Sequence, residues 1–345
     1  GPREVAVGCA KRHVHQRSRG GETIRSFRAG GGINDLAIAD IDGDGKGEVI
    51  AGSGDRRCYV LDSAGRERWH YEGAAGHDPY WGRYWKAGEV EKVLAADIDG
   101  DGDLEVVFGA ANMHIHACDT DGELLWRFTE YGVCTSIMAA DLTGDGRMEV
   151  IGGPAKITCN STCHVIGADG TEIMRSGNDG WASALTAICS ASLGADGAIQ
   201  VVCGTNMNNV YALAPEGDDL ERRWTYTAGD IITSMCAATL LDGEAQHVVV
   251  GSASEFVHLL DSEGTAVWDA RLADPVTRVA AADVNGNGRD EVVASTRYAV
   301  YVLDGAAGEA LAVYIADSPI VSFRAGEEIL VVTEDGNVRV LQIVG

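Results

Sequence analysis

The chain has 345 residues and carries 27 Lys and Arg against 52 Asp and Glu, which gives a formal net charge of −25. A surface this acidic argues against nucleic acid or an anionic membrane as the partner of the whole molecule. No apolar run is long enough to cross a bilayer. We therefore expect no nucleic acid partner and no membrane insertion.

The sequence begins with Gly1-Pro2, which resembles the scar left by a protease. No signal peptide is visible, so we expect that an upstream signal was removed and that the protein is secreted, periplasmic or on the cell surface. The nine cysteines are an odd number, so at least one is unpaired within the chain. Cys118, Cys189, Cys203 and Cys236 lie within apolar strand runs and are expected to be buried as small apolar residues. Cys159 and Cys163 flank a short turn, and whether they form a disulfide stays open.

An acidic nine-residue phrase recurs four times, at 40–48, 97–105, 141–149 and 283–291. The first copy reads Asp40-Ile-Asp-Gly-Asp-Gly-Lys-Gly-Glu48. Oxygen donors at alternate positions, glycines for a tight turn and a closing Glu make a small cage for a hard cation. Apolar runs flank each copy, so the phrase is predicted to be the turn of a β-hairpin.

Two further strands are predicted after each of these hairpins. The third strand ends in Asp, as in 58–62 and 301–304, and a Gly turn then leads into a fourth strand that carries Trp69, Trp126 or Trp268. The pattern repeats every 42–50 residues or so, which is the period of a four-stranded propeller blade.

The predicted fold is therefore all-β, a single β-propeller domain over 1–345 built from four-stranded antiparallel blades. Partial blades are predicted at 4–27 and 319–343, and a long inter-blade insertion at 72–92. This organisation favours eight blades, with seven as the alternative if the two ends combine. Six full blades are predicted to begin near Leu36, Val93, Ser136, Leu185, Thr233 and Arg278.

The acidic loops resemble the FG-GAP or VCBS type of calcium-binding β-propeller repeat, and the Leu-Asp…Gly-x-x-x-Trp ends resemble the PQQ-like propeller repeat. The resemblance covers nearly the whole chain and implies Ca²⁺ at up to four structural sites. The family pattern implies as side-chain ligands Asp40, Asp42, Asp44, Glu48, Asp97, Asp99, Asp101, Glu105, Asp141, Thr143, Asp145, Glu149, Asp283, Asn285, Asn287 and Glu291. In the family these hairpins lie opposite the usual ligand face, so no catalytic role is expected for the ions.

No nucleotide, flavin or quinone is expected as a cofactor. PQQ-dependent enzymes typically place an adjacent Cys pair against the quinone, and this sequence has no such pair.

The insertion at 72–92 is the first candidate binding segment, because it concentrates aromatic and basic residues. Trp81, Trp85 and Lys86 lie there, and aromatic faces with fixed polar groups suit a sugar ring. The alternative is a lid that fills its own small core. Further candidate substrate-binding residues on the same predicted face are Lys11, Arg12, Arg56, Arg57, Trp181, Arg297 and Tyr298.

Basic residues on an acidic molecule suggest an acidic polysaccharide or glycoconjugate as the partner, with scattered solvated charge as the alternative. Several lyases that cut uronate polymers are propellers that this chain resembles. Such a reaction needs a base, an acid and a cation beside the carboxylate, and His77, Tyr80 and Tyr84 with Arg83 are the candidates. The alternative function is a non-catalytic glycan- or protein-recognition, adhesion or scaffold module. Whether the protein is an enzyme stays open, with a polysaccharide lyase as the favoured interpretation, and its oligomeric state is also open.

Two x-His-x-His pairs could place two imidazoles on one side of a strand, at His13 with His15 and at His114 with His116. Such a pair can bind zinc or copper. Tyr211 and Tyr301 occupy the same position in other repeats, which favours an aromatic residue packed between neighbouring blades.

Overall fold

The computed structural model describes residues 5–18, 22–73, 88–130, 132–155, 162–176, 184–194, 197–241 and 245–342. These residues form thirty β-strands and no helix, and accordingly no helix there has the length and apolar character needed to span a membrane. The all-β prediction is confirmed. The chain divides into two compact units, the first comprising Gly1–Ala182 with Gly217–Asp219 and the second Ser183–Glu216 with Leu220–Gly345.

The first unit contains one three-stranded sheet followed by three four-stranded antiparallel meanders. The three-stranded sheet consists of β1 (Val5–Cys9), β2 (His13–Arg17) and β3 (Thr23–Arg28). The meanders are β4 (Ile33–Ala39), β5 (Glu48–Ser53), β6 (Arg57–Leu61) and β7 (Glu67–Glu72); β8 (Val90–Ala96), β9 (Glu105–Ala110), β10 (His114–Cys118) and β11 (Leu124–Thr129); β12 (Val133–Ala140), β13 (Glu149–Ala155), β14 (His164–Ile166) and β15 (Glu172–Ser176).

The second unit contains three four-stranded meanders followed by a three-stranded sheet. The meanders are β16 (Leu185–Ser192), β17 (Ile199–Thr205), β18 (Asn209–Glu216) and β19 (Asp219–Thr227); β20 (Ile232–Ala238), β21 (His247–Ser252), β22 (Phe256–Leu260) and β23 (Ala266–Arg271); β24 (Arg278–Ala282), β25 (Glu291–Ser295), β26 (Ala299–Leu303) and β27 (Ala310–Ile315). The last sheet consists of β28 (Ile320–Arg324), β29 (Ile329–Thr333) and β30 (Val338–Leu341).

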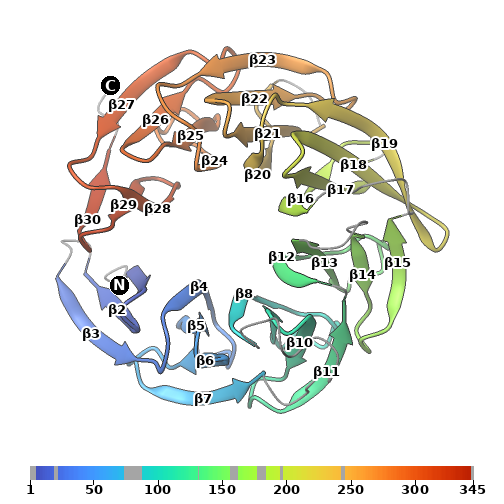
Figure 1. Ribbon diagram of the computed structural model, residues 1–345, viewed down its shortest axis with the longest axis vertical. Coiled ribbons are helices and arrows are strands. Elements are labelled where there is room, and N and C mark those ends of the chain that lie inside the picture. Colours follow the sequence, from blue (N-terminus) through green and yellow to red (C-terminus); the bar gives the residue numbers. More distant parts are fainter. Residues whose placement is uncertain are drawn as a thin grey trace. The chain divides into compact units, whose positions relative to one another are not determined.

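The strands of each meander follow one another in chain order, as β4 to β7 show in Figure 1. The six four-stranded meanders begin at Ile33, Val90, Val133, Leu185, Ile232 and Arg278, each within three residues of the predicted start. The three strands expected near each end of the sequence are also present. Whether these sheets form one domain stays a prediction.

Burial changes along each meander in a regular way. The second strands β5 and β9 are buried along their whole length, whereas the fourth strands β7 and β27 alternate between exposed and half-buried residues. A strand covered on both faces reads as a continuous apolar run, and a strand covered on one face alternates. The sequence pattern of a strand therefore indicates whether the strand is covered on one face or on both faces.

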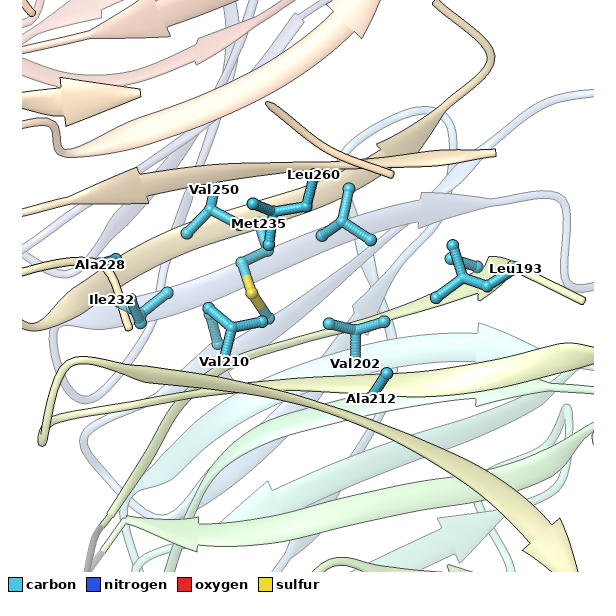
Figure 2. Packing of buried hydrophobic residues seen from close by; sticks show 12 residues of the cluster. Leu193, Val202, Val210, Ala212, Ala228, Ile232, Met235, Val250 and Leu260 are labelled. Atoms are coloured by element: carbon cyan, nitrogen blue, oxygen red, sulfur yellow. The ribbon is translucent and has the colours of Figure 1, made fainter. Parts of the chain in front are cut away.

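The core lies between consecutive sheets. One cluster joins β16–β19 to β20–β23, and Figure 2 shows the Met235 side chain of β20 reaching toward Val202 and Val210 of the neighbouring sheet. Val202, Val210 and Val250 are completely buried, and each buried aliphatic side chain of this size contributes roughly 1.5–3 kcal/mol. Equivalent clusters join the other consecutive sheets within each unit.

A tryptophan on the fourth strand docks on the glycine turn of the next sheet. The indole nitrogen of Trp224 donates to the Ser262 carbonyl at 2.9 Å, and a Cβ added to Gly264 would lie 2.5 Å from the Trp224 ring. Trp69 packs on Gly122 in the same way, and so does Trp268 on Gly308. The glycine of each Gly-x-x-x-Trp pattern therefore leaves room for the indole of the preceding sheet, and the Trp of the same pattern docks on the following sheet.

Candidate functional site

The four acidic loops connect first and second strands, as predicted: β4 to β5, β8 to β9, β12 to β13 and β24 to β25. Each loop bends through two glycines with positive φ, for example Gly43 (69°) and Gly45 (83°) in the first. At these angles a side chain would be strained, so glycine at the fourth and sixth positions is required by the turn. The same bend brings the alternating side chains of the loop inward.

In the first loop the carboxylates face a common centre. One oxygen each of Asp40, Asp42 and Glu48 lies within 4.8 Å of the others. Asp40 Oδ2 accepts a hydrogen bond from the Gly45 amide at 2.9 Å, whereas Asp40 Oδ1 is buried without a hydrogen-bond partner in the described part of the chain. An unpartnered buried oxygen costs free energy unless a donor or a cation satisfies it, so this donor set fits a hard cation.

The closing Glu of each loop is buried, with 1–5% of its surface exposed. Its carboxylate accepts a hydrogen bond from the backbone amide seven residues earlier, at 3.2 Å for Glu48, 2.8 Å for Glu105, 2.7 Å for Glu149 and 3.1 Å for Glu291. Burial raises the pKa of Glu105 to about 7, and its three loop aspartates add a smaller increase. A bound cation would relieve this crowding of negative charge.

The loops differ in the groups that compete for these oxygens. In the third loop Thr143 donates to Glu149 Oε1 at 3.0 Å, and in the fourth loop Asn285 donates to Glu291. Three carboxylates also converge in the second and third loops, at Asp97, Asp99 and Asp101 and at Asp141, Asp145 and Glu149. The fourth loop has fewer charges than the other three, and its weaker binding of a cation is a prediction.

The turns between second and third strands share an uncommon backbone conformation with the β1–β2 turn, whose three-stranded sheet corresponds to the second, third and fourth strands of a meander. Arg12, Arg56, Met113, Asn208 and Glu255 all have φ between 58° and 78°, although none is glycine. In each case the carbonyl of this residue accepts a hydrogen bond, at 2.8–2.9 Å, from the amide that follows the fourth strand of the same sheet. The conformation is thus held by a repeated backbone bond that ties the turn to the end of the sheet.

Sequence reasoning singled out Arg12 and Arg56 at these turns for their charge and missed the conformation. Aligning the repeats by their third strands would have placed all five residues at one position. That position is Arg in two of the repeats and Met, Asn or Glu in the other three.

The basic candidates are distributed over both units. Arg56 and Arg57 both pair with Glu72, at 3.9 and 3.6 Å, which partly neutralises them. In the second unit the Arg297 guanidinium stacks over the ring of Tyr298, with 5.4 Å to the centroid. Lys11 and Arg12 are exposed in the β1–β2 turn. A role of these residues in ligand binding stays a prediction.

Several predicted residues lie outside the described part of the chain. These are the catalytic candidates His77, Tyr80, Arg83 and Tyr84 and the binding candidates Trp81, Trp85, Lys86 and Trp181. Cys159, one half of the predicted disulfide, is also outside it, and Cys163 is a buried free cysteine. Nothing in the described residues therefore supports the uronate lyase.

The His114–His116 pair lies on β10 between neighbouring sheets. His116 is buried and stacks on Phe108, with 4.7 Å between the ring centroids, and Tyr71 contacts it from the preceding sheet. Burial lowers the pKa of His116 to about 3. This residue is an aromatic packing element of the core, as the repeat pattern indicated.

No protein-family model and no curated protein matches the sequence. Among solved structures, Sqt1 from Saccharomyces cerevisiae aligns with a TM-score of 0.77 at 14% identity, covering 99% of this chain and 93% of Sqt1. Sqt1 from Chaetomium thermophilum, bound to the N-terminus of ribosomal protein L10, aligns with a TM-score of 0.73 at 14% identity and covers 99% and 92%. BBS1N in complex with ARL6DN aligns with a TM-score of 0.65 at 12% identity and covers 90% and 93%.

At 12–14% identity such likeness shows the fold alone. The chain has a β-propeller fold, so this part of the sequence prediction is confirmed. The number of blades stays a prediction.

Proposed function

We propose that this protein is a non-catalytic recognition module that binds a protein partner through the turns between its second and third strands. One observation carries the proposal. The repeated backbone bond keeps these turns alike, while the residue at the left-handed position changes from Arg56 to Met113 in the first unit and from Asn208 to Glu255 in the second. A constant scaffold that presents variable side chains is suited to recognition.

The likeness to solved structures favours a protein over a glycan as the partner. The Chaetomium Sqt1 is bound to the N-terminus of a ribosomal protein, and BBS1N is in complex with ARL6DN. These partners are known for Sqt1 and BBS1N only. The two complexes are nevertheless examples of propellers that recognise proteins. Exposed Met207, beside Asn208, and exposed Tyr298, in the β25–β26 turn, add apolar contact area of the kind that protein interfaces use.

We propose Ca²⁺ as the structural ion of the acidic loops. Asp40, Asp42, Asp44 and Glu48 would hold it in the first loop, and the corresponding residues in the other three. The unpartnered Asp40 oxygen and the crowded carboxylates support this assignment. The ion would supply positive charge that fixes the hairpin turn and couples loop order to binding. We also propose eight blades, because the strands of the described residues make six consecutive four-stranded meanders and two groups of three strands, although the strands of two of these meanders belong to one eight-stranded sheet.

Site-specific photo-crosslinking tests the recognition surface. A photoreactive phenylalanine analogue replaces Met113 or Asn208 at the variable turns, and the matched control carries it at Lys46, in an acidic loop joining a first to a second strand. In extracts of the source cells, the two turn positions should crosslink the same protein, and position 46 should not. A glycan array and an ultraviolet assay for unsaturated sugar run in parallel.

Crosslinking of one protein from both turn positions, with no glycan bound and no unsaturated product, is the expected result. Saturable binding to a polysaccharide without a protein crosslink would overturn the proposal in favour of glycan recognition. Release of unsaturated sugar would overturn its non-catalytic part.

A further inference from the structure

The β1–β2 hairpin brings together three side chains that bind soft metal ions. One ligand atom each of Cys9, His13 and His15 lies within 4.8 Å of the others. Cys9 is directly opposite His13 in the antiparallel register, and His15 follows two residues later on the same strand. Residues opposite one another and residues two apart share a face of the sheet, so all three side chains point to one side.

The two imidazoles of the cluster lie close together. Their rings are stacked, with centroids 5.4 Å apart and planes 9° from parallel. The Nδ1 atom of His13 lies 2.9 Å from the Lys11 carbonyl, which can accept but not donate a hydrogen bond. Nδ1 must then carry the proton, which leaves the lone pair of Nε2 free for a metal.

His15, like His116 of the second pair, has an unsatisfied ring nitrogen, but in the described part of the chain only His15 has two further ligand groups beside it. Its Nδ1 atom is buried and has no hydrogen-bond partner within the described residues. A buried imidazole nitrogen without a partner costs free energy, and hydrogen bonding or metal ligation is what normally removes that cost.

The second x-His-x-His pair provides the internal comparison. The cross-strand partner of His114 is Ala110, which offers no ligand, whereas the partner of His13 is Cys9. The rings of His114 and His116 are nearly perpendicular, at 87°. Identical spacing in sequence therefore produces a three-ligand cluster on one hairpin and a packed aromatic pair on the other.

From this geometry we infer that Cys9, His13 and His15 form a binding site for Zn²⁺, with a fourth position open to water or another ligand. Zn²⁺ is typically bound by thiolate and imidazole ligands, whereas Ca²⁺ is bound by oxygen ligands. In a tetrahedral site, neighbouring ligand atoms are separated by about 3.3–3.7 Å. Small side-chain rotations of the three residues would close the cluster to that spacing. The inference is independent of the proposed partner and of the acidic loops.

Cobalt substitution tests the site. The protein is stripped with a chelator, supplied with excess Ca²⁺ to occupy the carboxylate loops, and titrated with Co²⁺. We expect one equivalent to produce a thiolate-to-cobalt charge-transfer band and strong tetrahedral ligand-field bands, which Zn²⁺ then abolishes. C9S should lose the charge-transfer band, H15A should weaken Co²⁺ binding at least about tenfold, and the control H114A should leave both unchanged.

A second measurement needs no variant. Saturating Zn²⁺ should slow the alkylation of Cys9 by about tenfold or more. Peptide mass spectrometry measures the alkylation rate. The absence of a charge-transfer band in the unmodified protein, its persistence in C9S, or equal alkylation of Cys9 with and without Zn²⁺ would each overturn the inference.

Discussion

At the scale of single residues, Glu130 departs most clearly from the repeat. The residue that follows the fourth strand is Ala29, Ala228 or Ala316 in other sheets, but here it is a fully buried carboxyl. Neither of its oxygens has a hydrogen-bond partner in the described part of the chain. The nearby Cys134 thiol donates instead to the Ser136 carbonyl, at 3.9 Å.

Burial raises the pKa of Glu130 from its ordinary value of 4.5 to about 7, and the proximity of Cys134 lowers it by a smaller amount. Between these two values the folded protein keeps a proton that the unfolded chain has released. The contribution of Glu130 to the free energy of unfolding therefore falls as the pH rises through this window, and is constant above it.

E130Q should remove this contribution. We expect the variant to match the unmodified protein near pH 4 and to be more stable near pH 8, by on the order of 3 kcal/mol. Urea unfolding of both proteins across this range gives the difference. E263Q, in an exposed turn, is the control and should show a small difference independent of pH. A flat difference for E130Q would contradict the assignment.

At the scale of elements, the contact between a tryptophan and the following glycine turn organises consecutive sheets. Gly264 has φ of 78° and faces the Trp224 ring. Gly217 also has positive φ, 65°, but a Cβ there would meet nothing within 4 Å. A side chain at either position would have to adopt the unfavourable left-handed backbone conformation. Only a side chain at Gly264 would also crowd the Trp224 ring.

G264A should therefore destabilise the protein more than G217A. The left-handed backbone costs each variant about 1–2 kcal/mol, and crowding against Trp224 adds about 1–3 kcal/mol to G264A alone. Urea midpoints, with tryptophan fluorescence as the signal, measure the difference. Equal midpoints for the two variants would show that the turn does not support the indole.

At the scale of the whole molecule, the acidic motif is distributed unevenly. Three of the four loops lie in the first unit, and one, at β24–β25, lies in the second. If Ca²⁺ fixes these turns, the ion stabilises the folded state by binding to it, and most of that stabilisation acts on the first unit.

Chelation should consequently increase amide hydrogen exchange most in the β4–β5, β8–β9 and β12–β13 hairpins. The β16–β17 and β20–β21 hairpins, whose sequences have lost the motif, should change least. Mass spectrometry with Ca²⁺ and with chelator measures both sets in one experiment. A uniform change, or none, would contradict a structural role for the ion.

The sequence alone determined the strands, their order within each meander and the positions of the acidic turns. These features depend on local periodicity, on glycine at positive φ and on a sequence pattern that recurs from one meander to the next. Gly43 and Gly45, for example, could be placed because a tight turn leaves few alternatives to glycine.

Only the tertiary structure decided which side chains meet. Cys9 joins His13 and His15 through antiparallel register, whereas the same spacing at His114 and His116 yields packed rings, and no sequence pattern distinguishes the two. Likewise, the buried Glu130 and the left-handed residues depend on how one strand end meets a distant turn. Such contacts join residues far apart in sequence, so their physical cause lies in the packed arrangement and not in the local pattern.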